Sequence, residues 1–286
     1  MQTLAQIREH LDRAGHPPKK ALGQNFLIDH NLIAKLVDAS GIGDASTVLE
    51  IGPGTGALTE PLLERGARVV AIELDAGLAR VLGDTLGGRF PDRLTILEGD
   101  CLESKRAINP AVLRALGDGP FALVANLPYH AATPAMMTLM TRVPRCTGLF
   151  ITIQKEVVDR VLARPGSKAY GAITVVARTL GAPERIANLP AECFWPRPGV
   201  ASAMLAWRRH AAPPGIDPAE LASIAQTLFQ SRRKKLGAVA TRLARGPVDC
   251  PEGVTPDDRI DALDPDRILA LCVAIRTALD TRTPER

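Results

Sequence analysis

The chain of 286 residues is 46% hydrophobic, which suffices for one large domain or for a large and a small one. Five cysteines with no Cys-x-x-Cys pair predict a reducing compartment and no metal site, and the net charge of +4 permits nucleic acid as a partner without proving it. Because we find no signal-peptide pattern and no run of about 20 apolar residues, we expect a cytoplasmic protein without a membrane span.

The segment before the first predicted strand holds one helix and two features of open meaning. Apolar residues at helical spacing predict a short amphipathic helix over residues 4–14. Lys19 and Lys20 could contact phosphates or lie in a solvated basic loop, and neither interpretation is favoured. Residues 23–27 (Gly-Gln-Asn-Phe-Leu) precede a helix with Asp29 as its expected N-cap, and taken alone their Phe and Leu favour core positions.

Residues 48–59 predict a strand, a glycine-rich loop and a helix in succession. The apolar run that ends at Ile51 is typical of a buried parallel strand. Gly52, Gly54 and Gly56 would let the backbone turn sharply and approach a nucleotide closely. The spacing is Gly-x-Gly-x-Gly rather than the dinucleotide Gly-x-Gly-x-x-Gly, so the loop alone leaves a methyl-donor site, another nucleotide fold and an ordinary loop open.

Acidic residues end the next two predicted strands. Glu73 could accept hydrogen bonds from both hydroxyls of a ribose, and its position behind the glycine loop favours this role over that of a solvated acid. Asp100 could accept from the amino group of an adenine. Strand and helix patterns alternate over residues 46–154, which predicts a doubly wound α/β sheet with its ligands at the carboxyl ends of the strands.

The fourth predicted strand runs into Asn-Leu-Pro-Tyr, a sequence that suggests a reaction. The Asn126 side-chain oxygen and the Leu127 carbonyl oxygen could accept both N–H bonds of an amino group on a base, which would free the nitrogen lone pair to attack a sulfonium methyl. Pro128 would fix the turn, and Tyr129 would stack on the base. Asn-x-Pro also occurs in ordinary turns, so the position after the fourth strand favours function here.

The segment over residues 155–207 is predicted to complete the sheet. Helices are expected at 155–163 and 172–180, with a loop between them that is a lid, an RNA contact or plain surface. Strands are expected at 184–189 and 202–207.

Two adjacent aromatics, Phe194 and Trp195, lie beside prolines in a chain that is poor in aromatic residues. A rigid ring could stack on an extruded base, and a place in the core is the alternative.

The remainder predicts a small all-helical domain. The Arg232–Lys235 charge run would ordinarily be solvated, but the scarcity of acids around it favours phosphate binding. We therefore divide the chain into a catalytic, donor-binding domain with an N-terminal extension at residues 1–208 and a helical RNA-docking domain at residues 209–286. The helices are expected at residues 218–230, 234–244, 256–263 and 265–279.

Eight segments in a fixed order carry a specific resemblance. They are residues 23–27, 50–56, 73–75, 99–100, 126–129, 154–157, 168–171 and 194–202. Together they resemble the small-subunit ribosomal RNA adenine dimethyltransferases, the KsgA/RsmA family, over about residues 18–270. The resemblance implies a Rossmann-like class I methyltransferase fold and S-adenosyl-L-methionine as cofactor. It also implies N6,N6-dimethylation of two adjacent adenosines in the 3′-terminal hairpin of small-subunit (16S) rRNA during ribosome biogenesis.

The resemblance also assigns residue roles. The catalytic turn comprises Asn126, Leu127, Pro128 and Tyr129, and the base-stacking role goes to Phe194. Small-subunit rRNA, in the immature small subunit, is the expected partner of a monomeric enzyme. The donor contacts are Asn25, Leu27, Gly52, Gly54, Glu73, Asp100 and Asn126.

Two other functions remain open on the same fold: a large-subunit rRNA adenine N6-methyltransferase of the macrolide-resistance type, and a non-catalytic ribosome assembly or transcription factor. His130 stands where the resembled family usually has Asn, and Ser231 interrupts its usual basic run. These departures concern contacts with RNA and leave the chemistry unaffected.

Overall fold

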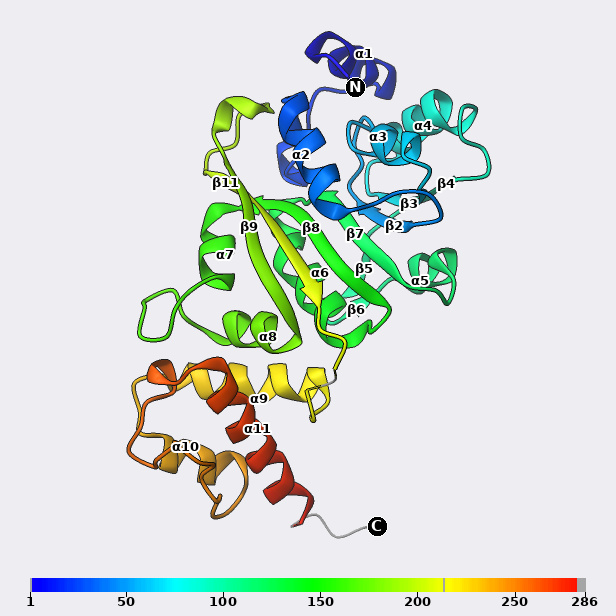
Figure 1. The fold of residues 1–286 in the computed structure, drawn as a ribbon. Coiled ribbons are helices and arrows are strands. Elements are labelled where there is room, and N and C mark those ends of the chain that lie inside the picture. The colour runs from blue at the N-terminus through cyan, green and yellow to red at the C-terminus, as the bar shows by residue number, and fades with distance from the viewer. Residues whose placement is uncertain (1, 213, 282–286) are drawn as a thin grey trace. The chain divides into compact units, whose positions relative to one another are not determined.

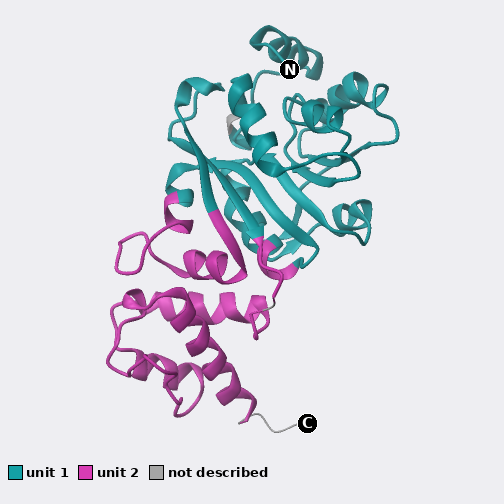
Figure 2. Cartoon of the chain, viewed as in Figure 1, with its two compact units in different colours: residues 1–139, 143–158, 184–208 teal, residues 140–142, 159–183, 209–286 magenta. Residues whose placement is uncertain are grey.

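The computed structural model describes residues 2–212 and 214–281, which form two compact units (Figure 2). Unit 1 comprises residues 1–139, 143–158 and 184–208, and unit 2 comprises residues 140–142, 159–183 and 209–286. Residues 159–183 therefore group with the C-terminal helices. The division after residue 208 stays a prediction about independent domains.

A seven-stranded sheet forms the framework, in the order β4-β3-β2-β7-β8-β11-β9 (Figure 1). The first five of these strands are parallel, and β11 is antiparallel to β8. The chain runs outward from β2 to β4 and then returns to place β7 beside β2. This reversal of strand order creates the crevice where such sheets bind ligands, and it confirms the doubly wound α/β prediction. The bounds are β2 (Thr47–Ile51), β3 (Arg68–Glu73), β4 (Leu94–Glu98), β7 (Phe121–Asn126), β8 (Cys146–Gln154), β9 (Gly181–Leu189) and β11 (Ser202–Arg209).

Local capping chemistry sets the ends of the helices before the glycine loop. Thr3 and Gln6 form a reciprocal capping box at the start of α1, and Gly15 ends that helix in the left-handed conformation. Asp29 caps α2 as predicted, with its carboxylate accepting from the Leu32 N–H. The helices between residues 4 and 161 are α1 (Leu4–Ala14), η1 (Lys20–Leu22), α2 (His30–Ser40), α3 (Thr59–Glu64), α4 (Ala76–Leu82), η2 (Gly83–Gly87), α5 (Pro110–Leu116), α6 (Tyr129–Arg142) and α7 (Lys155–Val161).

Two small sheets lie outside the sequence-based predictions. β1 (Phe26–Leu27) pairs with β10 (Phe194–Trp195), which follows the short helix η3 (Ala191–Cys193). β5 (Leu102–Ser104) pairs with β6 (Ala107–Ile108). Strands of two or three residues have no measurable hydrophobic period, so only tertiary structure brings them together.

Unit 2 contains α8 (Ala172–Leu180), α9 (Pro218–Gln230), α10 (Leu236–Leu243) and α11 (Pro265–Asp280). The helix predicted over residues 256–263 is wrong, because only the short 3₁₀ helix η4 (Ile260–Ala262) forms there.

The backbone hydrogen bonds of this segment explain its irregular course. The carbonyl oxygens of Pro256 and Asp258 accept from the N–H groups of Gly237 and Leu236, at the start of α10. The Asp258 carboxylate accepts from the Thr255 N–H. These oxygens satisfy another helix instead of extending one of their own.

Within the described ranges, no helix is long and apolar enough to cross a bilayer. The same residues contain no group of three or more His, Cys, Asp or Glu side chains placed to hold a metal ion.

Candidate functional site

A cavity in unit 1 collects residues from the ends of several strands and from the segment before α2. Its lining includes all but one of the predicted site residues, and Phe194 is the exception. The predicted residues that line it are Asn25, Leu27, Gly52, Gly54, Glu73, Asp100, Asn126, Leu127, Pro128 and Tyr129.

The glycine loop is packed too tightly for side chains. Gly54 has a φ of +59°, and a Cβ there would lie 2.9 Å from the Phe26 ring. At Gly52, with a φ of +70°, a Cβ would lie 3.3 Å from Pro128. The glycines thus let the loop approach both the 23–27 segment and the catalytic turn.

Replacing Gly54 by Ala should therefore weaken the predicted binding of a methyl donor by at least roughly tenfold. A left-handed Ala costs about 1–2 kcal/mol, and the methyl group would displace the Phe26 ring. Equilibrium binding of S-adenosyl-L-methionine checks this. Gly43→Ala is the control, because a Cβ at Gly43 meets no atom within 4 Å in the described structure. Equal affinity of the two variants would contradict the prediction.

Glu73 is buried, and its carboxylate is oriented by the backbone. One oxygen accepts from the Gly54 N–H at 2.9 Å, and the other accepts from the Asp75 N–H at 3.0 Å. Burial raises the pKa of Glu73, and these N–H donors oppose that rise. The carboxylate is thus held in place while each oxygen keeps a lone pair for a further donor.

Glu50, in β2, lines the same cavity and was not among the predicted site residues. Its side chain is 1% exposed, and its Oε2 has no hydrogen-bond partner among the described residues. Burial, together with the charge of Glu73, raises the pKa of Glu50 to about 8, which Thr59 only partly offsets. The signal in the sequence was an acid inside an otherwise apolar strand. A buried acceptor without a partner is costly, so Glu50 suits a ligand with a donor group.

The catalytic turn is tied to the 23–27 segment. Asn126 Nδ2 donates to the Asn25 carbonyl oxygen at 2.8 Å, which leaves Asn126 Oδ1 to act as an acceptor. The Leu127 N–H donates to the Thr152 carbonyl oxygen on β8. These bonds hold both proposed amine acceptors in place.

Tyr129 lies at the start of α6 and lines the cavity. Its hydroxyl and that of Ser202 are 2.6 Å apart, in hydrogen-bond contact. Burial raises the pKa of Tyr129, so this phenol stays protonated at neutral pH. The contact with Ser202 restrains the ring.

Asp100 is exposed and lies two residues after the end of β4. Its Oδ1 accepts from the Leu102 N–H, and its carbonyl oxygen accepts from Asn109. The second carboxylate oxygen remains for a ligand.

Phe194 is 2% exposed and lies in the hydrophobic core, paired with Leu27 across the two-stranded sheet. Phe194 thus lies in the core, which was the alternative to stacking in the sequence analysis. Its stacking on a base stays a prediction. Trp195 is partly exposed, with the Arg8 guanidinium 5.3 Å from the ring centroid.

The basic run in unit 2 divides into structural and exposed cations. Arg232 donates to the Asp261 carboxylate and to the carbonyl oxygens of residues 167, 168 and 170. Lys235 pairs with Asp257 at 2.7 Å. Arg233 and Lys234 are exposed. The loop at 164–171, whose Tyr170 is buried, is thus held by Arg232 as part of the fold of unit 2.

A comparison with known families identifies the family to which this fold belongs. A sequence model described as ribosomal RNA adenine dimethylase matches residues 15–276. The chain belongs to this family. The resemblance inferred from the eight sequence segments is thereby confirmed.

Curated relatives of this dimethylase match most of its length. Ribosomal RNA small subunit methyltransferase A of Acidothermus cellulolyticus is 37% identical over 268 residues, covering 91% of this chain and 89% of that protein. The protein of the same name from Leifsonia xyli subsp. xyli is 39% identical over 237 residues, covering 81% of each.

Solved structures confirm the class I methyltransferase fold of this dimethylase. A dimethyladenosine transferase from Plasmodium falciparum matches with a TM-score of 0.72 at 21% identity, covering 88% of this chain and 98% of that one. The 23S rRNA methyltransferase ErmE matches with a TM-score of 0.62 at 25% identity, covering 89% and 99%.

Proposed function

We propose that this dimethylase transfers methyl groups from S-adenosyl-L-methionine to N6 of two adjacent adenosines in the 3′-terminal hairpin of small-subunit (16S) rRNA. The observation that carries the proposal is the single cavity that joins the glycine loop and Glu73 to the turn at Asn126. The product would be N6,N6-dimethyladenosine, made during ribosome biogenesis. A monomer in the cytoplasm, acting on the immature small subunit, belongs to the same proposal.

The lining fits the methyl donor by its chemistry. The glycine loop offers a cradle that side chains would fill, and Glu50 offers a buried acceptor without a partner among the described residues. Glu73 would accept from the ribose hydroxyls, Asp100 from the adenine amino group, and Glu50 from the ammonium of the amino-acid part. When bound, S-adenosyl-L-methionine supplies the electrophilic methyl group.

The catalytic turn would prepare the amine. Asn126 Oδ1 and the Leu127 carbonyl oxygen would accept the two N–H bonds, which directs the nitrogen lone pair toward the methyl group without a strong base. Tyr129, restrained through Ser202, would stack on the extruded adenine. A second stacking surface from Phe194 would require that ring to leave the core, so Tyr129 is the aromatic on which the proposal relies.

Exposed cations of unit 2 would bind rRNA phosphates. A double variant, Arg233→Ala with Lys234→Ala, should weaken binding of the rRNA hairpin and reduce the slope of log K against log salt by about 1–2. Thermal stability should not change, because both side chains are exposed. The measurement is hairpin binding across a salt series, together with a melting curve.

Arg232→Ala is the contrasting variant for that experiment. It should lower the melting temperature, because it leaves the Asp261 carboxylate and three carbonyl oxygens of the loop without their donor. An unchanged salt slope in the double variant would show that these cations do not touch rRNA.

The function itself is tested by nucleoside mass spectrometry of rRNA from cells that lack their own dimethyltransferase. Expression of this chain should restore dimethyladenosine in small-subunit rRNA, and the Asn126→Ala variant should not. The mark on large-subunit rRNA would favour the macrolide-resistance type of enzyme. A folded protein that binds donor but leaves no mark would favour a non-catalytic assembly factor.

A further inference from the structure

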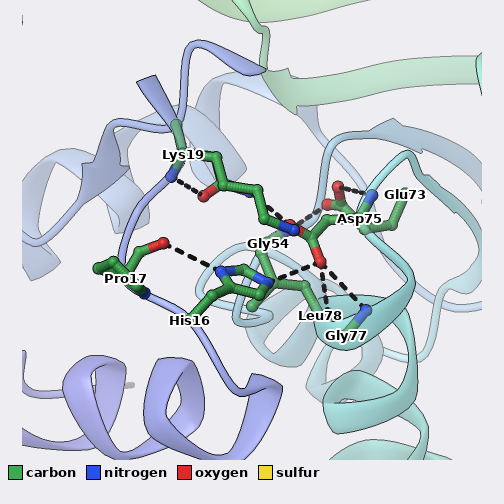
Figure 3. Close-up of polar contacts among 9 residues, drawn as sticks. His16, Pro17, Lys19, Gly54, Glu73, Asp75, Gly77 and Leu78 are labelled. Atoms are coloured by element: carbon green, nitrogen blue, oxygen red, sulfur yellow. Dashed lines mark hydrogen bonds and ion pairs between the residues drawn. The ribbon is translucent and has the colours of Figure 1, made fainter. Parts of the chain in front are cut away.

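One buried carboxylate, that of Asp75, has no part in the proposed chemistry and yet holds the segment beside the cavity. We call residues 16–24 the strap. Asp75 lies two residues after the end of β3, and its side chain is 1% exposed. Lys19 Nζ lies 2.8 Å from one carboxylate oxygen, and His16 Nε2 lies 2.9 Å from the other (Figure 3). Gln24 Nε2 donates to the same oxygen that Lys19 contacts, at 3.2 Å. Three strap side chains thus converge on one acid.

The carboxylate is also fixed from its own side. Asp75 Oδ1 accepts from the N–H groups of Gly77 and Leu78 at the start of α4 (Figure 3). Burial alone would raise the pKa of Asp75, but contacts with Lys19 and His16 outweigh it and lower the pKa to about 2. The acid is therefore a charged anchor at any physiological pH.

The strap leads directly into the wall of the cavity. Residues 22–27 all line it, and Asn25 in this stretch accepts from Asn126 of the catalytic turn. The backbone N–H of Asp75 also donates a hydrogen bond to the Glu73 carboxylate. Asp75 thus touches both the strap and the acid that the proposed function assigns to the ribose.

The two ends of the strap are held by other means. Before it, Ile7 and Leu11 of α1 pack in an apolar cluster with Leu78 and Val81 of α4. After it, Phe26 and Leu27 pair with β10. Between these fixed ends, polar contacts with Asp75 hold the strap in place, so loosening them should free the cavity wall without unfolding α1.

We infer that Asp75 is a positioning residue for the donor: it latches the strap so that the wall formed by residues 22–27 stays closed over bound donor and slows its release. This inference rests on the proposed donor site. Loss of the latch should therefore raise the donor KM more than it changes kcat, because Leu127 stays bonded to Thr152 on β8 and keeps the turn in place.

The Asp75→Asn variant separates the latch from the helix cap. Asn caps helices as well as Asp does, so the bonds from Gly77 and Leu78 to Oδ1 can persist, while the ion pair between Lys19 and the other carboxylate oxygen is lost. We expect the dissociation rate of S-adenosyl-L-methionine, measured by stopped flow, to rise roughly tenfold. Lys19→Met removes one partner and should give a smaller rise. Combined with Asp75→Asn it should add little, because the two residues act through one contact.

Asp84→Asn is the matched control. It removes the exposed pair between Arg13 and Asp84, a contact at 3.5 Å that also involves the N-terminal segment, and should leave the dissociation rate unchanged. Limited trypsin digestion gives a second readout, because Lys19 and Lys20 are cleavage sites within the strap. Cleavage there should be faster in Asp75→Asn than in the unaltered protein, and bound donor should slow it in both.

The outcomes separate this inference from the proposed function. Wild-type dissociation rates in both Asp75→Asn and Lys19→Met, with donor binding lost in Glu73→Ala, would overturn the latch and leave the donor site intact. Undiminished donor binding in Glu73→Ala would instead count against the proposed site. If Asp75→Asn does not fold, Lys19→Met decides the matter through the dissociation rate and through cleavage after the remaining Lys20.

Discussion

An Asn126→Ala variant should lose about 10²–10³-fold in kcat while its affinity for S-adenosyl-L-methionine stays within roughly threefold of the original. The physical reason is that Asn126 Oδ1 is proposed to orient the amine, whereas most donor contacts come from other residues of the cavity. Single-turnover methylation of an rRNA hairpin, with donor binding measured in parallel, checks both numbers.

Two further variants sharpen this test. Asn126→Asp keeps an acceptor oxygen but cannot donate to the Asn25 carbonyl oxygen, so it should fall between the unaltered protein and Asn126→Ala. Asn188→Ala, at an exposed position whose side chain contacts Arg185, should leave kcat unchanged. A fully active Asn126→Ala enzyme would refute the role of this side chain.

A Glu50→Gln variant should bind the donor at least roughly 30-fold more weakly, because it removes the buried charge proposed to pair with the donor ammonium. Isothermal titration at pH 8 measures this. Glu64→Gln, which changes an exposed acid near Arg89, is the matched control and should bind normally.

The same variant should make the donor-free protein more stable. The pKa of Glu50 is about 8 in the folded state against 4.5 as its ordinary value, so the folded state binds the proton more tightly. The stability contributed by the protonated form is complete below pH 4.5 and is lost as the pH rises toward 8, with an upper limit of about 5 kcal/mol. The Glu50→Gln variant has no carboxyl group to ionise at this position, so it does not lose this stability as the pH rises.

Melting curves of donor-free protein therefore test the sign. The melting temperature of Glu50→Gln should exceed that of the original protein by several degrees at pH 8 and by little at pH 4.5. A variant that is less stable at pH 8 would show that Glu50 is satisfied within the fold and is not held ready for a ligand. The pair of results would identify Glu50 as a residue that costs stability for function.

Local patterns were sufficient for the sheet and for most of the cavity. The parallel strands are short, mostly apolar runs, and Gly52, Glu73 and Asn126 lie at or directly after the carboxyl ends of three of them. They could therefore be assigned to one edge of the sheet. Caps such as Asp29 are equally local, since the side chain bonds to the backbone three residues on. The family resemblance extended this to the donor and the substrate.

Residues that act through distant partners could not be assigned in this way. Lys19 was left between a phosphate contact and a solvated loop, and it in fact pairs with Asp75 across the fold. Arg232 belonged to a run for which we favoured phosphate binding. Its guanidinium instead pairs with Asp261 and donates to a carbonyl oxygen of the 164–171 loop. The sequence alone does not show which residue of opposite charge lies within 4 Å of a given charged side chain.

By itself the sequence indicated the parallel strands, the glycine loop, the Asn-Leu-Pro-Tyr turn and the family, because all of these follow from hydrophobic period and from short motifs. Tertiary structure alone decided that Phe194 lies in the core, that Glu50 is buried without a partner among the described residues, and that Asp75 holds the strap. Burial and pairing depend on what packs nearby, and a pKa follows from that surrounding rather than from the residue type.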